Sequence, residues 1–161
     1  MGKLVPFLLA VCALLSLCAC EGEPQTISTA QYTLSLPDGY TTESQDDSSL
    51  LFLADNAPVG GLRSLPWEDT GDLGFQNVKD PTDDNLTSLL TALLDEGEVV
   101  EVSSFSSSLF SDVQLDLHTN QRHESHYFFL QDKVVYDLWF QTGSLTEDAE
   151  TAILRSFSLR T

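Results

Sequence analysis

The sequence predicts an α+β domain in which an antiparallel β-sheet is packed by two helices. Three observations predict it: strand-like alternation of apolar and polar residues recurs along the chain, a leucine stripe at helical spacing interrupts it, and an amphipathic segment closes it. Residues 29–161 are long enough to bury a hydrophobic core, so we expect them to form one domain.

Three strands are expected before the leucine stripe. Residues 30–36 alternate apolar and polar side chains, as a half-buried strand does. Residues 50–53 and 59–65 flank a loop of four or five residues at 55–58, which is typical of a hairpin. Gly60-Gly61 inside the later strand indicates a bulge or a close approach of another backbone.

The first helix is predicted from leucines that recur at i, i+3, i+4, i+7 and i+8 and so form one buried stripe. These leucines are Leu86, Leu89, Leu90, Leu93 and Leu94. Gly97 is expected to end the helix. The long Gly- and Asp-rich segment 66–84 precedes it, and long loops are often functional. Within it, Trp67 is a candidate anchor for a partner, with packing over the sheet edge as the alternative.

Four more strands and a helix are expected after Gly97. The strands are predicted at 99–102, 113–117, 123–131 and 134–141. Ser144 and Glu147 have the spacing of a capping box, which predicts the start of the last helix. One face of that helix is apolar, with Ala149, Ala152, Ile153 and Phe157.

The N-terminus has the organisation of an export signal. Lys3 precedes an apolar stretch over residues 4–17, which is shorter than the roughly 20 residues that span a bilayer. The following Leu17-Cys18-Ala19-Cys20 resembles the lipobox of bacterial lipoproteins. That resemblance implies cleavage between Ala19 and Cys20 and a diacylglyceryl thioether on Cys20. An ordinary signal peptide and an uncleaved anchor remain as alternatives.

The expected organisation is therefore a signal peptide at 1–19, a lipidated tether at 20–28 and a domain at 29–161 on the outer face of a bacterial cytoplasmic membrane. Loss of Lys3 leaves 6 basic side chains against 25 acidic ones, a formal charge of −19. Such a surface repels phosphate backbones, which excludes nucleic acid as a partner. No cofactor is expected.

A second resemblance covers most of residues 29–160. The segments "YTLSLPDGY" from Tyr32, "HYFFLQDKVVYDLWFQTG" from His126 and "EDAETAILRSFSLR" from Glu147 resemble the PsbP/Mog-like α/β/α sandwich. The resemblance implies a non-enzymatic binding or assembly role. PsbP itself uses basic surface residues, from which this acidic chain departs, so no functional residue is carried over.

Candidate metal ligands fall in two places. His118 and His123 can meet across a hairpin near Asp116 and would suit Zn²⁺ or Ni²⁺ if a third ligand joined them; ordinary surface histidines are the alternative. His126 is expected on the opposite face from His123. Oxygen ligands for Ca²⁺ are offered by Asp69, Asp72 and Asp83, whose alternative role is in solvated turns and helix caps.

The mature chain contains no thiol besides Cys20 and no G-x-S-x-G or S-x-x-K motif, so we expect no enzyme. The leading hypothesis is a lipid-anchored binding or assembly module for another cell-envelope protein. The alternative is a lipoprotein that binds a small ligand or a cation such as Ca²⁺. A hydrolase with spatially paired carboxylates is the third hypothesis.

Overall fold

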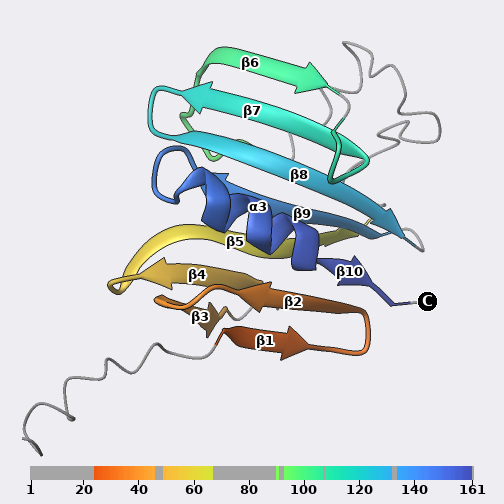
Figure 1. Ribbon diagram of the computed structural model, residues 1–161. Coiled ribbons are helices and arrows are strands. Elements are labelled where there is room, and N and C mark those ends of the chain that lie inside the picture. Colours follow the sequence, from red (N-terminus) through yellow and green to blue (C-terminus); the bar gives the residue numbers. More distant parts are fainter. Residues whose placement is uncertain are drawn as a thin grey trace, which may run out of the picture.

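The computed structural model describes residues 24–45, 49–66, 90, 93–106, 108–131 and 134–160. Within these ranges the chain forms ten strands in two antiparallel sheets, together with one complete helix, α3 (Figure 1). No helix in the described part is long and apolar enough to cross a membrane.

The larger sheet has seven strands in the order β3-β4-β5-β9-β8-β7-β6. Its strands are β3 (Tyr40–Ser44), β4 (Leu50–Ala54), β5 (Ala57–Pro66), β6 (Val100–Ser106), β7 (Val113–Thr119), β8 (His123–Gln131) and β9 (Val134–Gln141). The long strands β5, β8 and β9 lie in the middle, where both of their edges are hydrogen-bonded. This centre therefore carries most of the buried side chains described below.

The smaller sheet has the order β1-β2-β10, with β1 at Gln25–Ser28, β2 at Tyr32–Leu36 and β10 at Ser158–Leu159. It lies beside α3 (Glu147–Ser156), and the two together cover one face of the larger sheet (Figure 1). The Ser156 hydroxyl joins them, because it donates to Ser35 O at 3.0 Å and accepts from Ser35 N at 2.9 Å.

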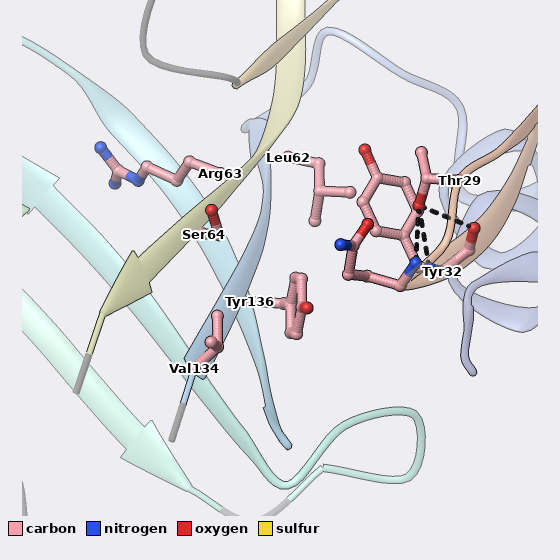
Figure 2. A pocket seen from close by; sticks show the side chains of 8 residues that line it. Thr29, Tyr32, Leu62, Arg63, Ser64, Val134 and Tyr136 are labelled. Carbon is pink, nitrogen blue, oxygen red and sulfur yellow. Dashed lines mark hydrogen bonds between the residues drawn. The ribbon is translucent and has the colours of Figure 1, made fainter. Parts of the chain in front are cut away.

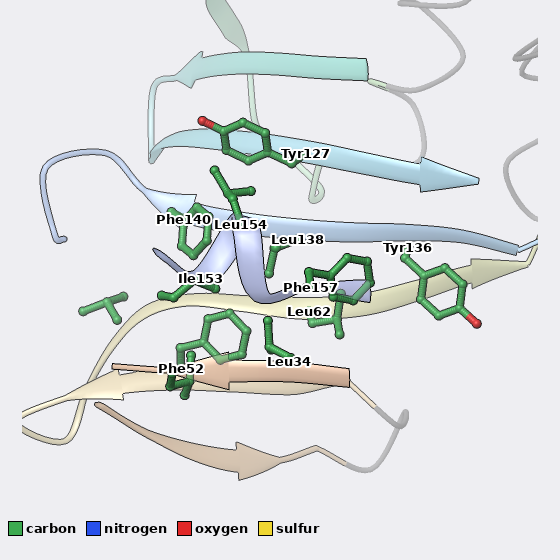
Figure 3. Close-up of a cluster of buried hydrophobic side chains, with 12 residues drawn as sticks. Leu34, Phe52, Leu62, Tyr127, Tyr136, Leu138, Phe140, Ile153, Leu154 and Phe157 are labelled. Atoms are coloured by element: carbon green, nitrogen blue, oxygen red, sulfur yellow. The ribbon is translucent and has the colours of Figure 1, made fainter. Parts of the chain in front are cut away.

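The main hydrophobic core fills the space between α3, the smaller sheet and the larger sheet (Figure 3). Its buried members come from β2, β4, β5, β8, β9, α3 and the residue that follows α3. They are Leu34, Leu36, Phe52, Val59, Leu62, Tyr127, Tyr136, Leu138, Phe140, Ile153, Leu154 and Phe157. Phe52, Phe140 and Ile153 are almost completely removed from water, so the core reaches from α3 to the sheet between β4 and β9.

A second hydrophobic cluster lies on the opposite face of β7, β8 and β9. It consists of Leu93, Val113, Leu115, Leu117, Phe128 and Val135. Alternate residues of these strands are buried on each face, as with Tyr127 and Phe128. Leu93 and Leu90 belong to helical backbone and pack against this cluster, as the leucine stripe predicts for them.

The β4–β5 hairpin turns through two residues, Asp55 and Asn56, which both have positive φ. Two-residue turns of this kind match the twist of the flanking strands. The pairing register then shifts between Phe52 and Leu53, which leaves Val59 as an extra residue in β5. The expected bulge is therefore present next to Gly60, although the loop is shorter than predicted.

The expected fold class is wrong. The described residues are mostly β-strand and form two sheets, whereas one sheet packed by two helices was predicted. The smaller sheet is the reason, because β2 pairs with β1 and β10 and does not join the main sheet. Part of that face of the larger sheet is thus covered by strands where a helical layer was expected.

Two boundaries also differ from the prediction. Gln25–Ser28, at the end of the expected tether, is strand β1, so the folded part begins before residue 29. The cap of α3 is Thr146, whose side chain accepts from Ala149 N at 3.2 Å. Ser144 instead donates to Val59 O and Gln141 O, so the predicted capping box does not form.

Candidate functional site

Two adjoining pockets lie where the start of β2 faces the last part of β5 and the start of β9. They have volumes of about 430 Å³ and about 280 Å³ and share Gln31, Val134 and Tyr136. We call the two together the groove. Figure 2 shows Leu62, Tyr32 and Tyr136 around the larger pocket.

The groove is lined by polar, aromatic and aliphatic groups, and its charged members are the two arginines Arg63 and Arg160. The rings of Tyr32 and Tyr136 meet edge to face with centroids 6.1 Å apart. Burial, and to a smaller degree Tyr136, raises the pKa of Tyr32, so its hydroxyl remains a hydrogen-bond donor at neutral pH. Thr29 Oγ1 fixes the adjacent turn because it accepts from Gln31 N and Tyr32 N.

Charge distinguishes the groove from the rest of this acidic chain. None of the described residues that line it is Asp or Glu, whereas the whole sequence contains 25. Arg160 lies at one end; its backbone N donates to Gln31 O at 2.8 Å and its side chain donates to Ser28 Oγ. It forms no ion pair with any described residue. Arg63 extends away from the groove (Figure 2).

A buried row of alternating charges crosses the opposite face of the larger sheet. We call it the charge network, and its members in order are Arg63, Asp137, His126, Glu124, Arg122 and Glu98. Asp137 and His126 are completely buried, and Glu124 is nearly so. Charged side chains are almost never buried unless they are paired, which this alternation achieves.

His126 lies between two carboxylates. Its Nδ1 is 3.0 Å from Asp137 Oδ1 and 3.2 Å from Oδ2, and its Nε2 is 3.2 Å from Glu124 Oε2. Nε2 forms no hydrogen bond, so this second contact is an ion pair when the ring is protonated. Because ionised carboxylates only accept, Nδ1 carries a proton that it donates to Asp137. The raised pKa of His126 favours a second proton on Nε2, which faces Glu124. Protonated His126 gives the network three positive and three negative members.

Arg63 forms one end of the network, and Arg122 holds Glu98 at the other end. Arg63 Nε donates to Asp137 Oδ2 at 2.8 Å. Arg122 binds Glu98 through two hydrogen bonds of 2.8 and 2.9 Å and donates to Glu124 at 2.6 Å. The hydrogen bonds from Arg122 outweigh burial and, with help from Asp95 N–H and Thr119, lower the pKa of Glu98 to about 2.

The network predicts a loss of stability as the pH rises. Burial alone disfavours the imidazolium, but the charge and hydrogen bond of Asp137, aided by Glu124, outweigh it and raise the pKa of His126 above 6.5. A group with a raised folded-state pKa stabilises fully below its unfolded pKa and loses that contribution as the pH rises through the folded value. The free energy of unfolding should therefore fall above pH 6.5.

Urea unfolding of the full chain from about pH 6 to about pH 9 measures this slope. Asp137→Asn is the comparison, since it removes the carboxylate that raises the pKa of His126, and its slope should be shallower. A free energy of unfolding that stays level or increases over this range would contradict a protonated His126.

The structure brings the predicted histidine pair together. His118 on β7 and His123 on β8 lie opposite each other, with ring centroids 4.5 Å apart. Asp116 does not join them, because it accepts hydrogen bonds from Ser104 and Ser125. His126 is on the other face, as predicted. No three His, Cys, Asp or Glu side chains among the described residues are arranged to hold a metal as they stand.

Other predicted site residues fall outside the described ranges. These are the lipidation and cleavage residues Ala19 and Cys20, the anchor candidate Trp67, and the calcium candidates Asp69, Asp72 and Asp83. The groove and the full charge network were both missed from the sequence. Arg122, Glu124 and His126 at alternate positions of one strand were the available signal for the network.

Comparisons with known proteins identify no family. No protein-family model matches the chain, and no curated protein matches its sequence. Similar solved structures include cyanobacterial PsbP (CyanoP) from Synechocystis sp. PCC 6803, with TM-score 0.43 and 15% identity over 89% of this chain and 97% of that one. A Bacteroides thetaiotaomicron crystal structure has TM-score 0.41 and 9% identity; the match covers 88% of this chain but only 49% of the other.

A PsbP-like protein is thus among the structures that this chain resembles, and the resemblance is loose. Both TM-scores lie below 0.5, so neither match says what this chain binds or does.

Proposed function

We propose that this chain is a lipid-anchored, non-enzymatic binding module, and that the groove receives a segment of another cell-envelope protein. The observation that carries the proposal is the shape and charge of the groove. Two pockets joined through Gln31, Val134 and Tyr136 make an elongated site, which suits an extended chain segment better than a compact molecule.

The chemistry of the lining supports a peptide as ligand. The Tyr32 hydroxyl, the Gln31 amide and the Ser64 hydroxyl offer hydrogen bonds to a main chain. Tyrosines supply large contact area at low cost in conformational entropy. Absence of carboxylates from the described lining, with Arg160 at one end, favours a neutral or acidic segment.

The anchoring part of the proposal rests on the lipobox-like residues. Lipid on Cys20 would lie five residues before the first residue of β1, Gln25. Five extended residues reach at most about 18 Å. The module would therefore be held close to the membrane surface and would meet partners whose binding segments lie near the bilayer.

Catalysis is not what the described sites favour. The described groove lining contains no carboxylate pair and no histidine, and His126 lies buried on the opposite face of the sheet. Asp137 and Glu124 are each engaged by charged neighbours. These arrangements support binding over a hydrolase with paired carboxylates.

The volume of the larger pocket favours a second candidate, a small polar ligand. Small-molecule sites commonly enclose about 300–1,000 Å³, and the larger pocket has about 430 Å³. Such a ligand would raise the melting temperature of the purified chain without any protein partner. Binding of cations by the loop at 66–84 concerns residues outside the described ranges.

In-cell cross-linking of the full chain, followed by mass spectrometry, tests the proposal. Gln31→Trp places a bulky side chain in the groove from an exposed position, and Gln121→Trp makes the same change at an exposed hairpin turn away from it. We expect one dominant cross-linked envelope protein. Its cross-linking yield should fall at least about tenfold in Gln31→Trp, which corresponds to about 1.4 kcal/mol of binding free energy. It should persist in Gln121→Trp.

Two results would count against this function. Equal cross-linking in both tryptophan variants would remove the groove from the partner interface. Cross-linking to no reproducible protein would reject the partner, and a rise in melting temperature with a small polar molecule would then support the second candidate.

A further inference from the structure

The histidine pair occupies a position where side chains of neighbouring strands come closest. Thr119 N donates to Arg122 O at 2.8 Å and closes the β7–β8 hairpin. In an antiparallel pair, hydrogen-bonded and non-hydrogen-bonded positions alternate, so the next pair outward, His118 and His123, is non-hydrogen-bonded. Side chains at such positions are about 4.5–5.5 Å apart at Cβ, within reach of a common ligand.

A bulge brings a carboxylate to the same place. In the β6–β7 pairing, Val100 pairs with Thr119 and Val102 pairs with His118, so Glu101 is an extra residue in β6. Bulges re-aim side chains, and Glu101 Oε2 lies 3.7 Å from His118 Nε2. This carboxylate takes the place that the sequence suggested for Asp116.

We propose that His118, His123 and Glu101 form a binding site for a divalent transition metal ion. Zn²⁺ is the ion used to test the site, and Cu²⁺ is expected to bind more tightly. Imidazole nitrogen with a carboxylate oxygen suits these borderline ions, and affinities increase from Ni²⁺ to Cu²⁺ and decrease again to Zn²⁺. Ca²⁺ and Mg²⁺ prefer sites made only of oxygen.

The site is assembled when the ion binds. The two rings stack at 19° to each other, an arrangement in which they do not yet share an ion. His118 and Glu101 are 45% and 54% exposed, so their side chains can turn without disturbing the core. Water completes the coordination. The net charge of −18 raises the local concentration of cations around the site.

Glu101 supplies the third ligand of the site. Its carboxylate already lies 3.7 Å from His118 Nε2, and both side chains are exposed, so small rotations bring an oxygen and a ring nitrogen to the same ion. Loss of a group that supports a metal site typically lowers metal affinity 10- to 100-fold.

Calorimetric titration of the full chain with Zn²⁺ tests the site. The chain is produced without a histidine tag, purified in detergent, and measured in excess Mg²⁺ so that scattered surface carboxylates are occupied. We expect one saturable Zn²⁺ site, weakened at least about 10-fold in His118→Asn and in His123→Asn, since each removes a direct ligand. The affinity for Zn²⁺ should also fall about 10-fold or more in Glu101→Gln.

Asp116→Asn is the matched control, because Asp116 lies on β7 beside the pair and contacts only neutral groups among the described residues; it should bind Zn²⁺ like the wild type. NMR of the histidine rings supplies a second readout: Zn²⁺ should shift the signals of His118 and His123 and leave buried His126 unchanged. Absence of a saturable site, or its retention in His118→Asn, His123→Asn or Glu101→Gln, overturns the assignment.

Discussion

Asp137→Asn is expected to lower the free energy of unfolding by about 3–5 kcal/mol, the range for breaking a buried ion pair by removing one partner. Asp137 is completely buried and contacts two cations, His126 and Arg63. The asparagine leaves the guanidinium of Arg63 without its counter-charge, and Arg63 Nη2 already lacks a hydrogen-bond partner. It also leaves the imidazolium of His126 with Glu124 alone.

Urea unfolding near pH 6 measures this effect, because His126 is protonated there in the wild type. Asp116→Asn is the control. Asp116 Oδ1 accepts from Ser125 at 2.9 Å and Oδ2 accepts from Ser104 at 3.2 Å. In the asparagine, the oxygen can accept from Ser125 and the NH2 group can donate to the Ser104 hydroxyl. It should cost less than about 1 kcal/mol. Equal losses in the two variants would show that the charge network does not stabilise the sheet.

Gly60→Ala is expected to lower the free energy of unfolding by about 1–3 kcal/mol, the range for overpacking a well-packed site. A Cβ at residue 60 would lie 2.5 Å from Trp139 O and 3.3 Å from Phe140 Cα. Both are backbone atoms of β9, so the clash is relieved only if two paired central strands move apart. The ring of Phe140, 2.9 Å away at Cδ1, would also have to shift.

If the clash does not exist, Gly60→Ala should raise the free energy of unfolding. Alanine restricts the unfolded chain more than glycine and stabilises by about 0.4–1 kcal/mol where it fits. Ser64→Ala, at an exposed position of the same strand, should stay within about 0.5 kcal/mol of the wild type. Urea unfolding therefore gives a clear answer, and a Gly60→Ala variant more stable than the wild type would contradict the close packing of β9 on β5.

Local patterns predicted much of the larger sheet. The hairpins β4–β5 and β8–β9 follow from alternation and from apolar runs separated by turn residues. β1, β3 and β10 were missed because they are short, polar or only two residues long. Their strand structure comes from pairing with neighbours, which a window along the sequence does not contain. For this reason the smaller sheet, and with it the observed fold class, was not predicted.

The sites could also be predicted only in part, because contacts between strands do not appear in a local sequence pattern. Alternation placed His126 with Glu124 on one face, but Asp137 joins them only through the register of β8 against β9. The spacing of His118 and His123 predicted their meeting, whereas Glu101 reaches them through a bulge. The groove combines residues near positions 30, 63, 135 and 160, so it depends wholly on tertiary structure.

Complete burial of His126 has a kinetic consequence. Its ring protons face Asp137 and Glu124, and none of the side chain is exposed. A proton can leave or return only when the sheet opens locally, and such openings are rare in the centre of a sheet. After a sudden change of pH, the imidazole would respond at the rate of this opening, far more slowly than the surface histidines. Its N–H protons should also exchange slowly enough with water to be observed as separate NMR resonances.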